Sequence, residues 1–312
     1  MPVKLGIVGV GKIARDQHLP VIAASGDFEL VAAASRHAQV DGVRNFTSLA
    51  EMLDAAPEVE AVSLCTPPVG RADDARRALA RGVHVLLEKP PTATLSEAHE
   101  LVAAAEAAQV TLYASWHSRF APAVPAARSW LRDRAVRGAR ITWMEDVRVW
   151  HPGQDWIFAP GGLGVFDPGI NALSIVTHIL PQPFALRAAR LAFPANRQGP
   201  IAAELSFQDV LGAPIAAELD FLHTGVQRWD IEVETDGGRL TLSKGGTEMA
   251  IDGEVQPVVP GAGRPHAEYE PLYAHFAALI AAGRSDVDLT PLRHVADAFM
   301  LGERVAAPAF DF

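Results

Sequence analysis

A glycine-rich run, Gly9-Val10-Gly11-Lys12-Ile13-Ala14, stands between an apolar stretch at residues 5–8 and a predicted helix. It reads G-x-G-x-x-A, a spacing that gains meaning from this strand-to-helix context. Gly9 permits a tight turn, Gly11 lets the backbone approach a pyrophosphate, and Ala14 lets helix and strand pack closely. The N–H groups that open the helix would face the phosphates. We therefore expect a dinucleotide contact at Gly9, Gly11, Lys12 and Ile13.

The end of the second apolar stretch, residues 28–34, bears on which dinucleotide would bind. An acidic residue at this point would hold both ribose hydroxyls of NAD, but the sequence reads Ser35-Arg36-His37. Ser35 can donate to a 2′-phosphate, and Arg36 can pair with its charge while His37 assists. We expect NADP as the preferred cofactor and NAD as a tolerated one. The alternative is that Arg36 is an ordinary solvated side chain.

Three further residues have types and positions that suit proton and charge transfer. Lys89 follows the fourth apolar stretch, residues 83–87, at the strand edge where doubly wound sheets bind ligands. Its ammonium could stabilise negative charge on a reacting oxygen. Asp167 and Asn171 are four residues apart, so they share one face of a predicted helix. Asp167 is a candidate general base, Asn171 can both donate and accept hydrogen bonds, and the alternative is that Asp167 only caps the helix.

Carboxylates and indole rings elsewhere in the sequence could hold a small molecule rich in hydroxyls, because carboxylates bind hydroxyls and indole faces cover C–H groups. The candidate substrate contacts are His117, Glu145, Trp150 and Trp156. Glu145 and Asp146 are neighbours on a predicted strand, so only one of them can face a pocket. His151 lies in the same region, but no tight ligand spacing such as H-x-x-x-H appears, and we expect no metal site.

The first 120 residues alternate short apolar runs with amphipathic stretches. The predicted strands cover residues 5–8, 28–34, 62–65, 83–87 and 110–114. Ser48-Leu49-Ala50-Glu51 and Thr94-Leu95-Ser96-Glu97 have the form of capping boxes that begin helices. Continuous apolar strands separated by helices are covered on both faces, which predicts a doubly wound parallel sheet of the Rossmann kind and an α/β fold class.

The pattern changes after residue 120, where a helix at 121–134 precedes a series of longer strands. These predicted strands cover residues 140–149, 186–193, 201–207, 215–222, 229–235 and 239–243, with helices at 272–282 and 292–305. Asp236-Gly237-Gly238 is typical of a hairpin turn. The sequence therefore predicts two domains, residues 1–120 and 121–312, the second an α+β domain on a largely antiparallel open sheet. An oligomer interface or the core of this second domain would explain three of its apolar residues, Phe221, Leu222 and Trp229.

The composition excludes several classes of partner. A formal net charge of -10 disfavours nucleic acid and anionic membranes. The single cysteine, Cys65, cannot form an internal disulfide, and its apolar surroundings in the sequence favour a buried small side chain. No apolar run approaches the ~18 residues of a membrane span, and Met1-Pro2-Val3-Lys4 has no signal-peptide layout. We expect a cytoplasmic protein.

Three motifs together resemble a known family. Glu88-Lys89-Pro90, the run from Gly161 to Asn171 and the glycine loop are similar to the signatures of the Gfo/Idh/MocA oxidoreductases, over essentially the whole chain. The runs at 11–18, 150–154 and 167–174 resemble the branch that contains bacterial L-arabinose and D-galactose 1-dehydrogenases. Asn171 stands where histidine is usual in the wider family.

This resemblance implies oxidation of C1 of an aldose to the aldonolactone, with hydride passed to NAD(P). It implies that Lys89 lies beside the nicotinamide and that Glu145, rather than Asp146, faces the sugar. We also assign to the cofactor site Cys65, Thr66, Pro67 and Glu88. For this chemistry, Lys89 and Asp167 must act on one hydroxyl over the same nicotinamide face.

Besides the cofactor, the expected partner is a small-molecule aldose sugar. We also expect the chain to form a homo-oligomer, a dimer. Two alternatives stay open: a non-catalytic sensor of nucleotide and sugar, and a family dehydrogenase that acts on a secondary hydroxyl, as inositol dehydrogenases do.

Overall fold

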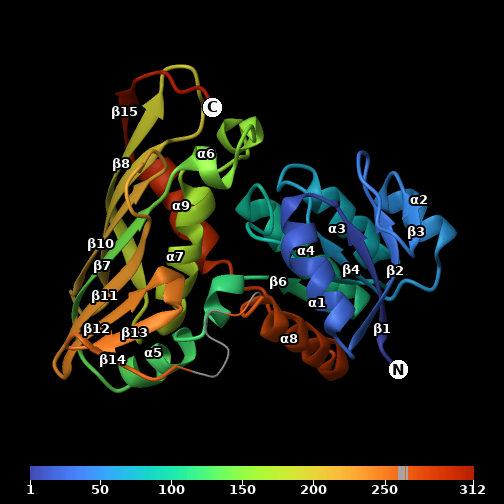
Figure 1. Ribbon diagram of the computed structural model, residues 1–312, viewed down its shortest axis with the longest axis horizontal. Helices are drawn as coiled ribbons and strands as arrows, with labels where there is room; N and C mark the ends of the chain where they lie inside the picture. The colour runs from blue at the N-terminus through green and yellow to red at the C-terminus, as the bar shows by residue number, and fades with distance from the viewer. Residues whose placement is uncertain (259–263, 265) are drawn as a thin grey trace. The chain divides into compact units, whose positions relative to one another are not determined.

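The computed structural model describes residues 1–258, 264 and 266–312, which form two compact units (Figure 1). The first unit comprises Met1–His117 and Glu268–Leu289, and the second comprises Ser118–Ala267 and Thr290–Phe312. The predicted division into residues 1–120 and 121–312 therefore does not include the returning segment Glu268–Leu289 in the first unit. The cause is aromatic packing, because Phe28 contacts Tyr273 and Phe276 of that segment at ring centroid distances of 5.6 Å.

The sheet of the first unit has six parallel strands in its described part, in the order β3-β2-β1-β4-β5-β6 (Figure 1). Their bounds are β1 Val3–Val8, β2 Phe28–Ala34, β3 Arg44–Phe46, β4 Ala61–Leu64, β5 His84–Leu87 and β6 Leu112–Ala114. The strand order reverses between β1 and β4, which is where a doubly wound sheet opens a crevice for a ligand. The predicted Rossmann sheet is confirmed.

Two helices of the first unit, α2 Leu49–Ala55 and α4 Leu95–Ala108, begin at the capping boxes predicted from the sequence. The others are α1 Leu19–Ala24, α3 Arg71–Ala80 and α8 Tyr269–Ala282, with a wide π-type turn at Ala14–His18 before α1. The Ser48 side chain accepts from the Glu51 backbone N–H, and Thr94 and Glu97 form a reciprocal capping box. Helix α8 lies beside α1 (Figure 1).

The second unit is built on a mixed sheet of nine strands among the residues that the structure describes, ordered β14-β13-β12-β11-β7-β10-β9-β8-β15. The strands are β7 Val136–Met144, β8 Phe184–Pro194, β9 Ala202–Asp209, β10 Pro214–Asp220, β11 Arg228–Thr235, β12 Gly238–Ser243, β13 Glu248–Ile251, β14 Glu254–Val255 and β15 Glu303–Ala307. The β7–β10 and β8–β15 pairs are parallel, and the other pairs are antiparallel. The prediction of a largely antiparallel sheet is confirmed.

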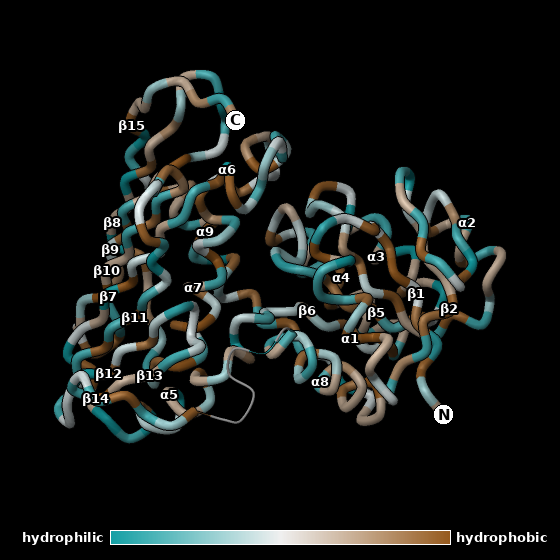
Figure 2. Tube along the Cα trace, viewed as in Figure 1, coloured by the Kyte–Doolittle hydropathy of each residue, from teal (hydrophilic) through white to brown (hydrophobic). Residues whose placement is uncertain are grey.

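One face of this sheet is covered by helices and the other is exposed. Buried and exposed residues alternate along β9 and β10, and Figure 2 shows the matching alternation of brown and teal along the long strands. The helices are α5 Val124–Leu131, α6 Val147–Trp150, α7 Phe166–Ile179 and α9 Thr290–Leu301, with short 3₁₀ turns at His117–Phe120, Asp155–Phe158 and Lys244–Gly246. Helix α7 lies close to the sheet, since a Cβ at Gly169 would come within 2.6 Å of Leu219.

Two predicted boundaries in the second unit are wrong. The strand predicted at residues 140–149 ends at Met144, because Asp146 caps the short helix α6 through the Arg148 backbone N–H. The helix predicted at 292–305 ends at Leu301, and Glu303–Ala307 pairs with β8 instead. Of the residues considered for an interface, Phe221 is fully buried in the core, whereas Leu222 is 37% exposed.

Candidate active site

The glycine turn after β1 has the shape that a close approach of backbone and ligand requires. Gly9 adopts a φ of +87°, and a Cβ there would lie 2.8 Å from the Thr66 backbone nitrogen, so no larger residue fits. At Gly11 a Cβ would meet no described atom within 4 Å, so the backbone there is open. The buried Thr66 hydroxyl oxygen has no hydrogen-bond partner among the described residues. These features fit a dinucleotide, which would fill the open space at Gly11 and supply a hydrogen-bond partner for Thr66.

Ser35, Arg36 and His37 follow β2 and line an open hollow of about 550 Å³. Arg36 and His37 are exposed and Ser35 is half-buried, held by a hydrogen bond from its N–H to the Phe46 carbonyl. Arg15 lines the same hollow and was missed by the sequence reasoning. Two guanidinium groups in one hollow favour an anionic occupant.

The loops after β4 and β5 are held together by a buried arginine, Arg71, which sequence reasoning also missed. Its Nε donates to the Thr66 carbonyl at 2.9 Å, and its terminal nitrogens bond the carbonyls of Thr66, Glu88 and Pro90. This side chain therefore fixes the backbone on both sides of Lys89, which is half-buried. Cys65, in the other loop, is half-buried against a small apolar cluster around Ile7 and Val10.

The Glu88 carboxylate points into the first unit, where protein donors surround it. Glu88 is 3% exposed, and its carboxylate accepts hydrogen bonds from the Lys89 N–H at 2.6 Å and the Tyr269 hydroxyl at 2.7 Å. His18 Nε2 lies 3.2 Å away. This carboxylate is thus suited to holding the loop, whereas the sequence reasoning listed it as a cofactor contact.

His117, which follows β6, lies against residues of the returning segment. Its Nδ1 is 2.5 Å from Glu268 Oε2, and its ring stacks on Tyr269 at a centroid distance of 5.2 Å. The imidazole therefore has a fixed orientation at the same edge of the sheet as Lys89. The neighbouring Trp116 is buried and donates to the Asp288 carbonyl, which indicates a packing role.

In the second unit, Asp167 and Asn171 lie one turn apart on α7, as predicted. Val165 occupies the N-cap position, so the interpretation of Asp167 as only a cap is wrong. Asp167 is 4% exposed and lies in the first helical turn, where the helix dipole favours a carboxylate. His151 Nε2 approaches its Oδ2 at 3.4 Å. An imidazole thus contacts this carboxylate although Asn171 replaces the family's usual histidine.

Glu145 and Asp146, which follow the end of β7, lie in different surroundings. Glu145 is 3% exposed and accepts from Trp229 Nε1 at 2.8 Å, while Asp146 caps α6. Trp229 stacks on Trp143 at 5.7 Å and meets the 40% exposed Trp150 at 5.3 Å. A carboxylate beside a row of indoles suits a sugar ring.

Two of the predicted aromatic contacts are held by nearby amides. Trp150 Nε1 donates to Gln227 Oε1 at 2.8 Å, and Trp156 Nε1 donates to Gln154 Oε1 at 3.3 Å. Trp229 was treated as a core or interface residue in the sequence reasoning. Its indole N–H bond to Glu145 joins two strands, β11 and the end of β7, so no local sequence pattern could reveal it.

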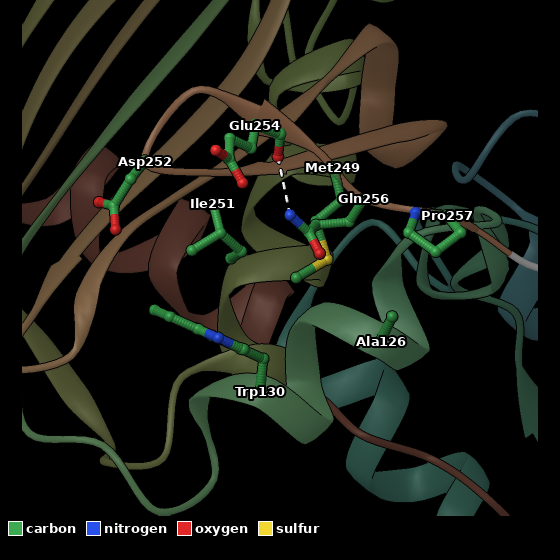
Figure 3. A pocket seen from close by; sticks show the side chains of 8 residues that line it. All are labelled: Ala126, Trp130, Met249, Ile251, Asp252, Glu254, Gln256 and Pro257. Atoms are coloured by element: carbon green, nitrogen blue, oxygen red, sulfur yellow. Dashed lines mark hydrogen bonds between the residues drawn. The ribbon is translucent and has the colours of Figure 1, made fainter.

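A hollow of about 560 Å³ in the second unit lies between α5 and the β13–β14 ribbon (Figure 3). Trp130 and two acidic residues, Asp252 and Glu254, line it, and Asp252 accepts from the Arg239 backbone N–H. The lining includes none of the predicted site residues. Within the described ranges, no three His, Cys, Asp or Glu side chains could hold a metal ion, and no helix is long and apolar enough to cross a membrane.

A glycine turn at the reversal point of a parallel sheet, with a lysine at its ligand edge, defines a dinucleotide-dependent oxidoreductase. Residues 3–115 match the family model described as "Oxidoreductase family, NAD-binding Rossmann fold". The chain is 47% identical to galactose 1-dehydrogenase of Pseudomonas fluorescens over 309 residues, which is 99% of each chain. It belongs to the Gfo/Idh/MocA oxidoreductase family.

Solved structures agree with this assignment. The crystal structure of a D-galactose-1-dehydrogenase protein from Rhizobium etli matches with a TM-score of 0.93 and 55% identity, covering 99% of this chain and 98% of that one. A 3-ketoreductase from Actinomadura kijaniata, solved with NADP and TDP-benzene, matches with a TM-score of 0.84 and 20% identity over 99% of this chain and 100% of that one. The second likeness shows the fold alone. The family resemblance and the oxidoreductase class predicted from the sequence are confirmed.

Proposed function

We propose that the protein oxidises C1 of a free aldose, D-galactose or L-arabinose, to the aldonolactone and passes the hydride to NAD(P), with NADP preferred. The observation that carries the proposal is the buried Asp167 carboxylate, which lies on one helix face with Asn171 and contacts His151. Full-length similarity to two proteins named as galactose 1-dehydrogenases supports the substrate class. D-Galactopyranose and L-arabinopyranose share their configuration at C2, C3 and C4, so both are candidate substrates.

The proposed reaction removes a hydride from C1 and a proton from O1 of the cyclic sugar, which leaves a C1 carbonyl. When bound, the nicotinamide supplies the hydride acceptor. The Asp167 carboxylate takes the O1 proton as general base. His151, with a side chain 22% exposed against 5% for Asp167, gives that proton a route toward solvent.

The remaining side chains hold the sugar and stabilise charge. The Lys89 ammonium donates a hydrogen bond to O1 of the sugar while the O1 proton passes to Asp167. This step requires Lys89 and Asp167 to act on the same hydroxyl. Asn171 donates to and accepts from a neighbouring hydroxyl. Glu145 and His117 bind further hydroxyls, and Trp150, Trp156 and Trp229 cover the C–H face of the ring.

NADP preference rests on Arg36 and Arg15, which line the hollow beyond β2 together with Ser35 and His37. A 2′-phosphate there would gain charge-assisted hydrogen bonds that a free ribose hydroxyl cannot make. Asp and Glu side chains are absent from the lining of this hollow among the described residues, so nothing acidic there would favour the ribose hydroxyls of NAD.

The proposal is tested by incubating purified protein with NADP or NAD and a panel of sugars while absorbance near 340 nm is followed. The panel contains D-galactose, L-arabinose, D-fucose, D-glucose and myo-inositol. We expect reduced cofactor with the first three sugars, and an aldonolactone as product. Turnover of myo-inositol alone would indicate a secondary-hydroxyl dehydrogenase, and binding without reduction would indicate a sensor. Either result would overturn the proposal.

A further inference from the structure

A chain of five buried polar side chains runs behind the Lys89 loop, all within the first unit. We call it the Glu88 network, and its members are His18, Ser63, Glu88, Tyr269 and Tyr273. Each of them is at most 3% exposed. His18 lies at the end of the π-type turn, Ser63 on β4, and the two tyrosines on α8. His18 and Tyr269 contact the Glu88 carboxylate directly, and Tyr273 and Ser63 extend the network from His18.

The charges in this network are set by its contacts. Burial raises the pKa of Glu88, but the hydrogen bond and charge of His18, with His117 and Tyr269, lower it to about 2. Burial also lowers the pKa of His18, yet Cys65, Tyr273 and Glu88 around the ring raise it well above 6.5. Both directions favour the charged forms, a carboxylate on Glu88 and an imidazolium on His18.

The hydrogen bonds then have defined directions. An imidazolium donates from both nitrogens, so His18 donates to Glu88 Oε1 at 3.2 Å and to the Tyr273 oxygen at 2.7 Å. The Tyr273 hydroxyl oxygen lies 2.9 Å from Ser63 Oγ, which continues the network to β4. Glu88 accepts from three donors: His18, the Tyr269 hydroxyl and the Lys89 backbone N–H.

A glutamine at position 88 could not replace this carboxylate. All three neighbours are donors, and the NH₂ group of an amide would face at least one of them. A buried ion pair is weak evidence for stability, because an apolar substitute of similar volume often serves as well. What an apolar side chain could not do is accept the Lys89 N–H, which is bonded at 2.6 Å.

We infer that His18, Glu88 and Tyr269 are positioning residues, which hold the backbone of Lys89 so that its ammonium reaches the reacting oxygen. The inference rests on the proposed function. Arg71 completes the arrangement, since it binds the carbonyls of Glu88 and Pro90 on either side of Lys89. The backbone N–H of Lys89 and the flanking carbonyls are thus all held by buried side chains.

The first arm of the test is independent of activity. Hydrogen exchange is followed by mass spectrometry in the full chain and in Glu88→Gln, with Tyr269→Phe as a milder variant that loses one hydroxyl. Asp209→Asn is the matched control, because Asp209 is another buried carboxylate, in the second unit, and it accepts from the backbone N–H groups of Leu211 and Ala213. We expect exchange at Lys89 to accelerate at least tenfold in Glu88→Gln and not in the control, while peptides of β1 keep their protection. Unchanged exchange at Lys89 would overturn the inference.

The second arm is a double-mutant cycle between Glu88→Gln and Lys89→Met, with kcat and KM measured for the sugar. If Glu88 acts through Lys89, Glu88→Gln lowers kcat at least tenfold in the wild-type background and has little effect beside Lys89→Met. His18→Gln keeps a donor and should retain more kcat than His18→Leu. Equal losses in both backgrounds would show a merely structural role and overturn the inference. If the wild-type chain turns over no sugar, the proposed function fails, and the exchange arm alone decides whether Glu88 holds Lys89.

Discussion

Asp167, the proposed general base, is buried, lies in the first turn of α7 and contacts an imidazole. The first turn of a helix is a favourable place for a carboxylate, and in the proposed mechanism His151 carries the proton onward. Asn171 lies one turn further along and cannot carry a proton. The proposed mechanism therefore gives proton transfer to a pair drawn from two different segments, Asp167 and His151.

Asp167→Asn removes the base while keeping the side-chain shape. We expect kcat to fall at least ~100-fold, in the range typical of general bases, while cofactor binding stays within about twofold. Steady-state kinetics and NADPH fluorescence measure the two effects. Asp155→Asn is the control, because Asp155 is exposed and pairs with Arg197. Turnover close to wild type in Asp167→Asn would place the base elsewhere.

Arg36→Ala tests the choice of cofactor. Loss of a charge-assisted hydrogen bond costs about 1.5–3 kcal/mol, so we expect the KM for NADP to rise roughly tenfold or more. The KM for NAD should change by less than about threefold, because NAD has no 2′-phosphate. Arg44→Ala is matched in charge and exposure, but Arg44 pairs with Glu58 outside the hollow. Equal changes for both cofactors would argue against a 2′-phosphate contact.

At the scale of single residues, the sequence showed which residue types could react but not which side chains they would contact. The glycine turn, Lys89 and Asp167 are recognisable because each belongs to a local pattern. The contacts of His151 with Asp167, Trp229 with Glu145 and His18 with Glu88 join residues between 16 and 84 positions apart. Only the folded topology brings such pairs together.

At the scale of elements, the loop that leads into α7 is confined by backbone contacts. Gly164 adopts a φ of +57°, and a Cβ there would lie 2.2 Å from the Pro200 carbonyl oxygen. The Asp167 backbone N–H donates to the Gly164 carbonyl at 2.9 Å, so this glycine sets where the helix begins. Its packing thus controls the placement of the candidate base.

Gly164→Ala should destabilise the protein by roughly 3 kcal/mol or more, because backbone strain adds to overpacking. Gly153→Ala is the matched control: its φ is +70°, but a Cβ would meet no described atom within 4 Å. The control should therefore cost only about 1–2 kcal/mol, the strain alone. Urea unfolding of both variants measures the difference. Equal losses would mean that the loop relaxes around the new methyl group.

The elements that the sequence predicted well are those with long apolar or alternating patterns, such as β2 and β10. It missed β3, β13 and β14, which have two to four residues each and carry polar or exposed side chains. The helix predicted at 292–305 extended into β15 because the apolar spacing there is ambiguous, and pairing with β8 decides the outcome. Short edge strands depend on their neighbours more than on their own residues.

For the molecule as a whole, the buried pair of His18 and Glu88 makes stability depend on pH. Because the pKa of His18 is raised in the folded protein, its contribution to the free energy of unfolding is full below about pH 6.5. That contribution is lost as the pH rises through the pKa of the folded state. The lowered pKa of Glu88 means that its contribution is full above 4.5 and is lost as pH falls through about 2. The other titratable groups that face the pair are Cys65, His117, Tyr269 and Tyr273.

We therefore expect the Tm difference between the wild type and His18→Gln to be greatest at pH 5–6.5 and to shrink as the pH rises further. Differential scanning calorimetry from pH 5 to 9 measures it. His99→Gln is the control, since His99 is exposed on α4 and should give a small, nearly constant difference. A difference that grows with pH would contradict the charged state assigned to His18.

Because α8 completes the first unit, the order in which a ribosome releases the chain has a consequence. Tyr269 follows Glu88 by 181 residues, so at about 5–20 residues per second its release comes roughly 10–35 s later. During that interval the nascent sheet lacks both tyrosines and the ring packing on Phe28. The amino-terminal half, although synthesised first, is thus expected to reach its final packing only as translation nears residue 289.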